Sequence, residues 1–404
     1  MSLYLSFLVD HHYHHPQVNV DLLCMTSMGL EEIEYKLCIK MAVQEGEARK
    51  VAIEARTMER EVETLMGLMP RIRNMLKESE AQEVDLALPE MIYGAFNTSS
   101  DGVLVAFDSL ALGWQRPALG PGLSLQMLIA TVESLARLHA ASSVFVQREK
   151  SLVSDFPHLK AAFYDCETAR TAIGSLLKDL RRLVRRVPGF QPQLAQVESW
   201  RERAGGMLAA ARRRRPEPPL VCITHGSPGI ENLLVKGEKV LLTDWKLSDL
   251  GSPLSDLAFL IFSSADQSTR LEQRQKLVET YHFAFCRALH RLGHDPASKW
   301  PNFSIDTVHE EFERCLFPAF LQAATNLMQQ VQDAESVFKA KPSEEAGEQL
   351  RQVGRRLVEL VDDATTSGFT RFNKLPNSSS KISCSVESCA SLTLVLPTPK
   401  STLF

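Results

Sequence analysis

The residues best able to do chemistry lie in one short block, ITHGSPGIEN, which ends at Asn232 and is followed twelve residues later by Asp244. Short apolar runs flank this block, so we expect a loop that presents the Asn232 amide and a strand end that presents the Asp244 carboxylate. Such hard oxygen ligands suit Mg²⁺, which takes one or two carboxylates and keeps several waters. The spacing therefore indicates a magnesium site of the kind that phosphoryl transfer uses, although each residue alone is also a common turn residue.

Short strands are expected around this block, over residues 220–246. The runs LVCIT, NLLVK and KVLLTD have the composition of buried strands, and tight turns separate them. Long helical patterns precede and follow the insert, in SLQMLIATVESLARLHAAS and over residues 254–363. We therefore expect a large helical lobe over 107–370 that carries a strand–loop–strand insert.

Residues 17–106 predict a smaller, strand-rich lobe. The β-prone runs VNVDLLCMTS and YKLCIKMAV come first, and EMIYGAF and VLVAF follow a helical pattern that begins near residue 46. We expect Pro70 to end that helix, because proline lacks the backbone N–H. The fold class is therefore α+β, with a small strand-rich N-terminal lobe and a large helical C-terminal lobe.

Both ends of the chain are expected to be disordered. Residues 1–16 carry the cluster HHYHH, which could bind a metal adventitiously and which we interpret as a solvated terminus. The tail 371–404 is rich in Ser, Thr and Pro and has no sustained period. The opening MSLYLSFLV lacks a basic segment, so we expect no signal peptide, and no run reaches the roughly 18 apolar residues of a membrane span.

Composition excludes several classes of protein. The chain has 404 residues, 44% of them hydrophobic, and a formal net charge of -4, so it is neither collagen-like nor fully disordered. The same charge gives no general bias toward nucleic acid or acidic membranes. The 8 cysteines include no CxxC pair, which argues against a disulfide-dense secreted domain and suits a reducing, cytoplasmic location.

Several ordered motifs resemble the ecdysteroid kinase-like (CHK kinase-like) branch of the aminoglycoside phosphotransferase-like kinases. HGSPGIEN…DW is similar to that family's HGDxxxxN…DF/DW core, and DWKLSDLGSPLSDLAFLIFSS is similar to its DFQxxxxGSPxxDLxxFLxxS. VLVAFDSLALGW resembles its hinge segment, LARLHAAS its LAxxHAxS, and MEREVETL its FxxExxxY helix. The resemblance spans residues 30–340 or so and implies a protein-kinase-like fold, ATP and Mg²⁺ as cofactors, and a small-molecule hydroxyl as acceptor, such as that of a steroid-like alcohol.

The resemblance also implies roles for individual residues. Lys40 would bind the α- and β-phosphates of ATP, and Glu61 would hold Lys40. Asp108 would lie at the hinge between the lobes. Asn232 and Asp244 would bind Mg²⁺, in agreement with the spacing described above.

Other roles rest on resemblance more than on pattern. Helical periodicity does not choose Glu61, because Glu54 and Glu59 lie about as close to the apolar face. His225 could be a catalytic imidazole, but the resemblance makes it a residue that packs the loop. Asp256 would brace the same loop from below. His139 lies on an apolar helix face and is expected to be a satisfied core histidine.

The chain departs from the family pattern at several positions. Ser227 stands where the family has its catalytic Asp, and a neutral hydroxyl cannot accept the substrate proton as a carboxylate does. Gly29 is the only glycine before Lys40, so no glycine-rich loop is visible, and the first strand is expected to be missing. Phe107 stands where the family usually has Glu. We therefore expect a kinase fold with an incomplete N-terminal lobe and impaired catalytic equipment.

Three functions compete at this point. The first is an ATP-dependent kinase of a small-molecule hydroxyl, impaired at Ser227, and the second is a pseudokinase that binds nucleotide or a partner as a scaffold. The third is a nucleic-acid-associated protein, which would use two basic clusters. Those clusters have no interleaved aromatics and are better interpreted as solvated surface, so no nucleic-acid or membrane partner is expected. They comprise Arg181, Arg182, Arg185 and Arg186, and Arg212 to Arg215.

Overall fold

The computed structural model describes most of the chain between residues 7 and 366. The described ranges are 7–10, 17–25, 32–42, 46–81, 84–97, 101–119, 122–160, 167–185, 191, 193–200, 218–340 and 342–366. All of them belong to one compact unit, Met1–Phe369. The HHYHH cluster, Arg212 to Arg215 and the tail 371–404 lie outside the described residues.

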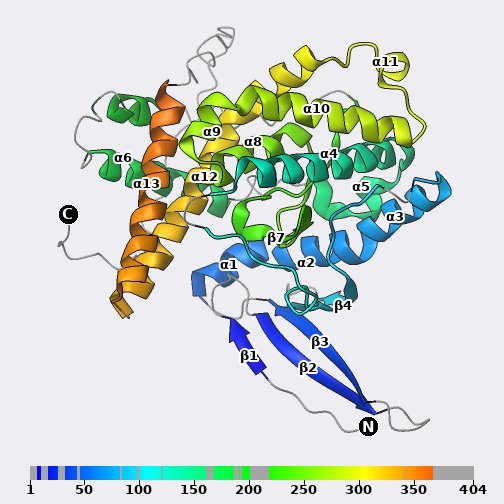
Figure 1. Cartoon of the computed structure of the whole chain (residues 1–404), viewed down its shortest axis with the longest axis horizontal. Helices are drawn as coiled ribbons and strands as arrows, with labels where there is room; N and C mark the ends of the chain where they lie inside the picture. The colour runs from blue at the N-terminus through cyan, green and yellow to red at the C-terminus, as the bar shows by residue number, and fades with distance from the viewer. Residues whose placement is uncertain are drawn as a thin grey trace. The chain divides into compact units, whose positions relative to one another are not determined.

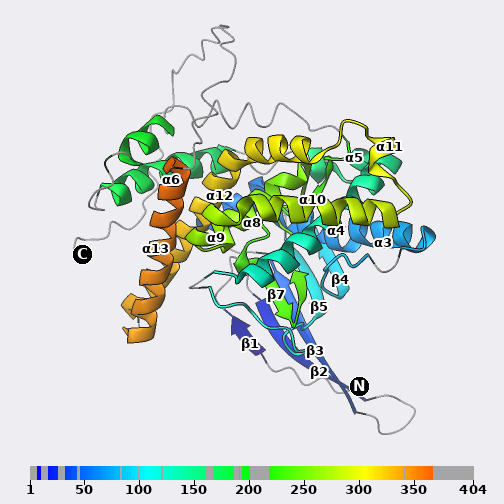
Figure 2. The ribbon, with the colours of Figure 1, turned by 45° about the horizontal axis from the view of Figure 1, so that its top comes forward.

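An antiparallel sheet forms the N-terminal lobe (Figure 1). Its strands in the described residues are β1 (Phe7–Asp10), β2 (Gln17–Met25), β3 (Glu32–Met41), β4 (Met91–Phe96) and β5 (Gly102–Phe107). Their order across the sheet is β1-β2-β3-β5-β4, and Figure 2 shows β2 and β3 as a long paired ribbon. Strand β3 therefore has a neighbour on each side, with Lys40 opposite Gln17 of β2 and Leu104 of β5.

Strand β1 corrects two expectations about the N-terminus. Disorder over 1–16 is wrong for Phe7–Asp10, and the first strand is not missing, because Phe7 lies opposite Val20 and Asp10 opposite Gln17. The physical reason is that β2 would otherwise end the sheet with a row of unpaired N–H and C=O groups, which a short antiparallel strand satisfies. Residues 11–16, between β1 and β2, include no glycine, in line with the expected lack of a glycine-rich loop.

A run of helical segments follows β3. They are α1 (Gly46–Glu54), α2 (Thr57–Val62), the π-helical turn η1 (Glu63–Leu68) and α3 (Met69–Glu78). The expectation that Pro70 ends the helix is wrong, because Pro70 lies in the first turn of α3. A proline is tolerated in a first turn, and the π-helical turn before it changes the hydrogen-bond pattern where the ring would crowd a carbonyl. The run breaks instead at Arg56, whose φ is 52°.

Two small antiparallel sheets form the insert that the sequence predicts near 220–246. Their elements are β6 (Cys222–Thr224), the 3-10 turn η4 (Ile230–Asn232), β7 (Leu233–Lys236), β8 (Lys239–Leu242) and β9 (Asp249–Gly251). Strand β7 pairs with β8, and β6 pairs with β9. The predicted strands of the insert are confirmed.

The C-terminal lobe is helical, as predicted. Its elements are α4 (Leu125–Arg148), α5 (Leu152–Asp155), the 3-10 turn η2 (Pro157–Lys160), α6 (Glu167–Val184), α8 (Pro253–Ser264), α9 (Gln267–Glu272), α10 (Arg274–Arg291), α11 (Pro296–Lys299), α12 (Ile305–Ala340) and α13 (Glu344–Thr366). Helix α8 is almost entirely buried and packs against α4 and α12, while α4 and α10 lie side by side in both views (Figures 1 and 2). The start of α8 places Asp256 in its first turn, beneath the insert.

Two arginines of the α6 basic cluster pair with acidic neighbours. Nε of Arg181 donates to Glu198 at 2.8 Å, and Nη1 of Arg182 donates to Asp179 at 3.0 Å. These pairs support the interpretation of a solvated helix face. Among the described helices, none combines the length and the apolar character that crossing a membrane requires.

Candidate functional site

A buried cluster of charged side chains joins the two lobes. Nζ of Lys40, on β3, lies 2.6 Å from Oε2 of Glu61, on α2, and 2.6 Å from Oδ1 of Asp244, just after β8. The Lys40 and Asp244 side chains are each 9% exposed, and that of Glu61 is 4% exposed. Burial by itself would lower the pKa of Lys40, but the carboxylates of Asp244 and Glu61 raise it. The fold thus brings three of the predicted site residues into direct contact.

Helix α2 is held against the segment that follows Asp244. The Trp245 N–H donates to Oε1 of Glu61 at 3.2 Å. The buried Arg60 guanidinium donates to the carbonyl of Ser248 at 3.1 Å. These two hydrogen bonds fix α2 against Trp245 and Ser248. The Glu61 carboxylate is therefore held between Lys40 and the backbone of Trp245.

The structure also chooses among the three candidate glutamates. Glu61 accepts from Lys40, whereas Glu59 accepts from Nε of Arg56 at 2.6 Å and Glu54 is exposed. The break at Arg56 interrupts the helical run between α1 and α2. A helical periodicity extended from α1 across this break therefore does not predict which glutamate side chain faces β3.

Asp244 has a strained backbone. Its φ of 63° lies in the left-handed region, which costs a residue other than glycine about 1–2 kcal/mol. The next residue is firmly anchored, since the Trp245 ring is fully buried, lies 4.6 Å from the His225 ring and donates from Nε1 to the carbonyl of Leu242 at 3.1 Å. Strain held at a charged residue is typical of a functional site.

Asp256 holds the loop from the start of α8. Its Oδ2 accepts from the His225 N–H at 2.6 Å, and its Oδ1 accepts from the Gly226 N–H at 3.0 Å. The His225 ring donates from Nε2 to the carbonyl of Thr243 at 2.8 Å and accepts at Nδ1 from the Ser227 N–H at 3.2 Å. Burial lowers the pKa of His225, although Asp256 opposes this. A neutral imidazole therefore packs between the loop and Trp245.

Ser227 and Asn232 bond to each other across the loop. Nδ2 of Asn232 donates to the Ser227 carbonyl at 2.9 Å and to its hydroxyl at 3.3 Å, and both residues are buried. The Thr243 N–H donates to the Asn232 carbonyl at 2.9 Å, so Asn232 and Asp244 lie at the same end of the β7–β8 hairpin. With its nitrogen engaged, Asn232 keeps Oδ1 as the amide atom that can act as a ligand.

His139 is the core histidine that the sequence predicts. It is fully buried on α4, with Nδ1 3.0 Å from the Tyr281 hydroxyl and Nε2 3.2 Å from Oδ2 of Asp256. Both ring nitrogens are thus engaged, and His139 supports Asp256 from the side opposite the loop.

A cleft of about 110 Å³ opens beside Lys40 and Asp244. The hinge segment Phe107–Leu110 lines it, and within that segment Oδ1 of Asp108 accepts from the Leu110 N–H at 3.0 Å. The remaining walls are largely apolar and include Cys38, Leu65, Leu104, Ala106 and Leu234. An apolar slot that ends at an ammonium group can accept a flat, weakly polar ring system that carries an anionic group.

The sequence between residues 19 and 294, more than half of the chain, matches the model of the ecdysteroid kinase-like family. The chain belongs to this family. Membership, together with the sheet order and the helical C-terminal lobe, confirms the α+β, two-lobed protein-kinase-like fold. It also supports a kinase-like phosphotransferase that acts on a small molecule.

Solved structures of kinases and phosphotransferases are similar to this ecdysteroid kinase-like chain. A choline kinase from Cryptosporidium parvum Iowa II is 10% identical, with 92% of this chain and 93% of that chain covered and a TM-score of 0.44. An amicoumacin kinase in complex with AMP-PNP and Ca²⁺ is 12% identical, with coverages of 89% and 90% and a TM-score of 0.43. A spectinomycin phosphotransferase in complex with ADP is 9% identical, with coverages of 90% and 94% and a TM-score of 0.43. A search of curated proteins finds no match.

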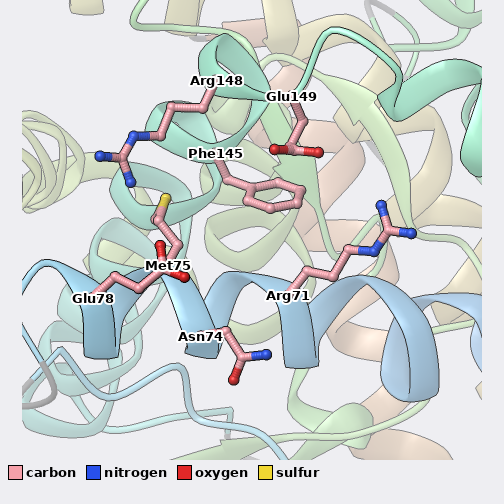
Figure 3. A pocket seen from close by; sticks show the side chains of 7 residues that line it. All are labelled: Arg71, Asn74, Met75, Glu78, Phe145, Arg148 and Glu149. Carbon is pink, nitrogen blue, oxygen red and sulfur yellow. The ribbon is translucent and has the colours of Figure 1, made fainter.

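A larger hollow, of about 550 Å³, lies between α3 and the end of α4 (Figure 3). Figure 3 shows Phe145 and Met75 between the side chains of Arg71 and Arg148. None of its lining residues lines the cleft at Lys40 or lies in a family motif that carries chemistry. The predicted site residues Lys40, Glu61, Asp108 and Asp244 line the smaller cleft and not this hollow.

Lys246 is the site residue that the sequence analysis missed. Its Nζ lies 2.7 Å from Oδ2 of Asp244, the oxygen that Lys40 does not contact. A signal was present, because Lys246 stands where the family's DFQ pattern has Gln. Only the fold shows that this lysine turns back onto Asp244.

Proposed function

We propose that this ecdysteroid kinase-like protein binds ATP in the cleft at Lys40, and that Ser227 impairs its transfer of phosphate to a small-molecule hydroxyl. The observation that carries the proposal is the buried contact of Lys40 with Glu61 and Asp244. Phosphoryl transfer is catalysed largely by positioning and by charge, and an ammonium group held in this way can hold the α- and β-phosphates. The adenine ring would lie in the apolar slot, against the hinge at Asp108.

The Mg²⁺ expected at Asn232 and Asp244 meets a carboxylate that is already engaged. Asp244 has one oxygen on Lys40 and the other on Lys246, whereas Asn232 donates to Ser227 from Nδ2 and can still offer Oδ1. These contacts fit a metal poorly, so no step of the proposed function passes through one.

Ser227 is proposed to slow the transfer step and not the binding of nucleotide. A general base contributes about 10²–10⁴-fold to such a reaction, which corresponds to ~3–5 kcal/mol of transition-state stabilisation. A neutral hydroxyl that already accepts a hydrogen bond from Asn232 does not replace that base. The acceptor proton then has no carboxylate at position 227 to receive it, while Lys40 and the slot are unaffected.

The acceptor that we propose is the hydroxyl of a small apolar molecule, such as a steroid-like alcohol, and family membership supports this class. The alternative is a pseudokinase that acts as a nucleotide-binding or partner-binding scaffold, which the neutral Ser227 favours. A cytoplasmic location is supported by Cys222, Cys286 and Cys315, which are free thiols.

Calorimetric titration of the full chain with ATP, followed by a phosphate-transfer assay on a steroid alcohol, tests the proposal. We expect ATP binding and transfer far below the ~1–100 per second of ordinary kinases. Binding without any detectable transfer would favour the scaffold alternative. Transfer at ordinary rates would show that Ser227 is no impairment. Failure to bind ATP in any buffer would contradict the kinase and the nucleotide-binding scaffold, and would leave only the partner-binding scaffold.

A further inference from the structure

Asp244 is bound by two ammonium groups, one on each carboxylate oxygen. Lys40 lies 2.6 Å from Oδ1, and Lys246 lies 2.7 Å from Oδ2. The Asp244 and Lys40 side chains are each 9% exposed and that of Lys246 is 19% exposed, so Lys246 lies on the more accessible side of the pair. Both oxygens of the carboxylate that would bind a metal are therefore engaged by cations of the chain itself.

The charges of this cluster balance without a metal ion. Lys40 and Lys246 carry two positive charges, and Glu61 and Asp244 carry two negative charges. A divalent cation at Asp244 would have to displace Lys246, or approach it to within a few ångströms in a site largely shielded from water.

The differences from the family pattern point the same way. Ser227 replaces an Asp and removes one negative charge, and Lys246 replaces a Gln and adds one positive charge. Of the two changes, only Lys246 places its charge on Asp244. Lys246 also has three N–H donors, of which Asp244 takes one, so two remain for phosphate oxygens.

We infer that Lys246 takes the place of the divalent cation at Asp244, and that this chain binds the phosphates of a nucleoside triphosphate without Mg²⁺. The inference rests on the proposed nucleotide site. It adds that Lys246 is the group that neutralises the phosphates in place of a metal ion. Lys40 holds the phosphates from the β3 side, and Lys246 holds them from the Asp244 side. Nucleotide binding is therefore independent of metal, whatever the transfer rate.

The test is calorimetric titration of the full chain with ATP, once in EDTA and once in excess Mg²⁺. We expect similar dissociation constants in the two buffers. In Lys246→Gln, which restores the family residue, affinity in EDTA is expected to fall about tenfold or more, because a charge-assisted bond to phosphate is lost. Excess Mg²⁺ is expected to restore part of that affinity, since Oδ2 of Asp244 is then free.

Lys239→Gln is the matched control, because Lys239 is an exposed lysine on the neighbouring strand β8. It is expected to bind ATP like the wild type in both buffers. Wild-type binding that requires Mg²⁺ would overturn this inference and leave the proposed nucleotide site intact, whereas no binding in either buffer would overturn both. Unchanged affinity of Lys246→Gln in EDTA, with an unchanged unfolding midpoint, would show that Lys246 does not hold the phosphates.

Discussion

The Lys40 side of the cleft and the loop 225–232 both contact Trp245, yet they present different charges to the space between them. On the Lys40 side, Glu61 accepts from Lys40 and from the Trp245 N–H. On the loop side, His225 packs on the Trp245 ring as a neutral imidazole, and the next side chain along the loop is the hydroxyl of Ser227. One side holds paired charges, and the other has a neutral hydroxyl at position 227.

Under the proposed function, this difference assigns binding and transfer to separate parts of the fold. Strand β3 and helix α2 hold the cations for phosphate, whereas the start of α8 holds the loop through Asp256. Helix α12 adds a hydrogen bond from Gln322 to the Gly226 carbonyl. Because the two sets of contacts share few residues, the loop can lose its carboxylate while the cation side stays assembled.

The largest effect is expected when the Lys40 side of the cleft is disrupted. Lys40→Met leaves the buried Glu61 carboxylate without its cation, and we expect a loss of about 3–5 kcal/mol in the free energy of unfolding together with the loss of ATP binding. Urea unfolding and calorimetry measure the two effects. Lys276→Met, at an exposed position of α10, is the control and is expected to change neither. A loss below about 1 kcal/mol would mean that the buried pair is not what joins the lobes.

The second-largest effect is expected when a carboxylate is restored to the loop at position 227. Ser227→Asp is expected to raise the transfer rate by about 10²-fold, at the low end of the general-base range, because the loop 11–16 still lacks glycine. ATP affinity is expected to stay nearly unchanged, since the base meets the acceptor proton and not the phosphates. Parallel rate and affinity measurements on Ser336→Asp, an exposed serine of α12, control for the added charge. A gain in affinity without a gain in rate would contradict the separation of binding from transfer.

A smaller effect concerns pH and the loop. Because burial lowers the pKa of His225, the folded protein binds fewer protons there than the unfolded chain, whose histidines titrate near ~6.5. The contribution of His225 to stability is therefore full above about pH 6.5 and falls as the pH decreases below it, by at most ~1.4 kcal/mol per pH unit. Urea unfolding between about pH 7 and 5 measures the slope, which His225→Gln is expected to reduce. The exposed His290→Gln is the control, and an equal change of slope in both variants would rule out the assignment.

The smallest effect lies at the larger hollow of Figure 3. Arg71 pairs with Asp155 at 2.7 Å, and both side chains are partly exposed. Arg71→Ala is expected to leave ATP affinity and transfer rate at their wild-type values, because no residue of that hollow lines the cleft. A clear loss of affinity in the same calorimetric assay would mean that the hollow belongs to the functional site.

Some features of the site could be predicted from the chain because they depend on neighbours in sequence. The runs around 220–246 predict the strands that place Asn232 and Asp244 at one end of a hairpin, and the structure confirms those strands. Where local rules competed with the rest of the fold, the predictions were wrong. Pro70 was expected to end a helix and lies in the first turn of the next one, and Phe7–Asp10 was expected to be disordered and pairs with β2.

The sequence by itself determined the two lobes, through the spacing of apolar residues, and the family, through its ordered motifs. The resemblance to that family then implied that Ser227 replaces a carboxylate. Only the tertiary structure decided that Lys40 pairs with Glu61 and not with Glu59, and that Lys246 pairs with the second carboxylate oxygen of Asp244. These contacts join strand β3, helix α2 and the end of strand β8, and Lys40 and Asp244 are 204 positions apart. A pattern along one segment carries no information about the partner across the cleft, because burial and charge compensation are settled only when the segments pack together.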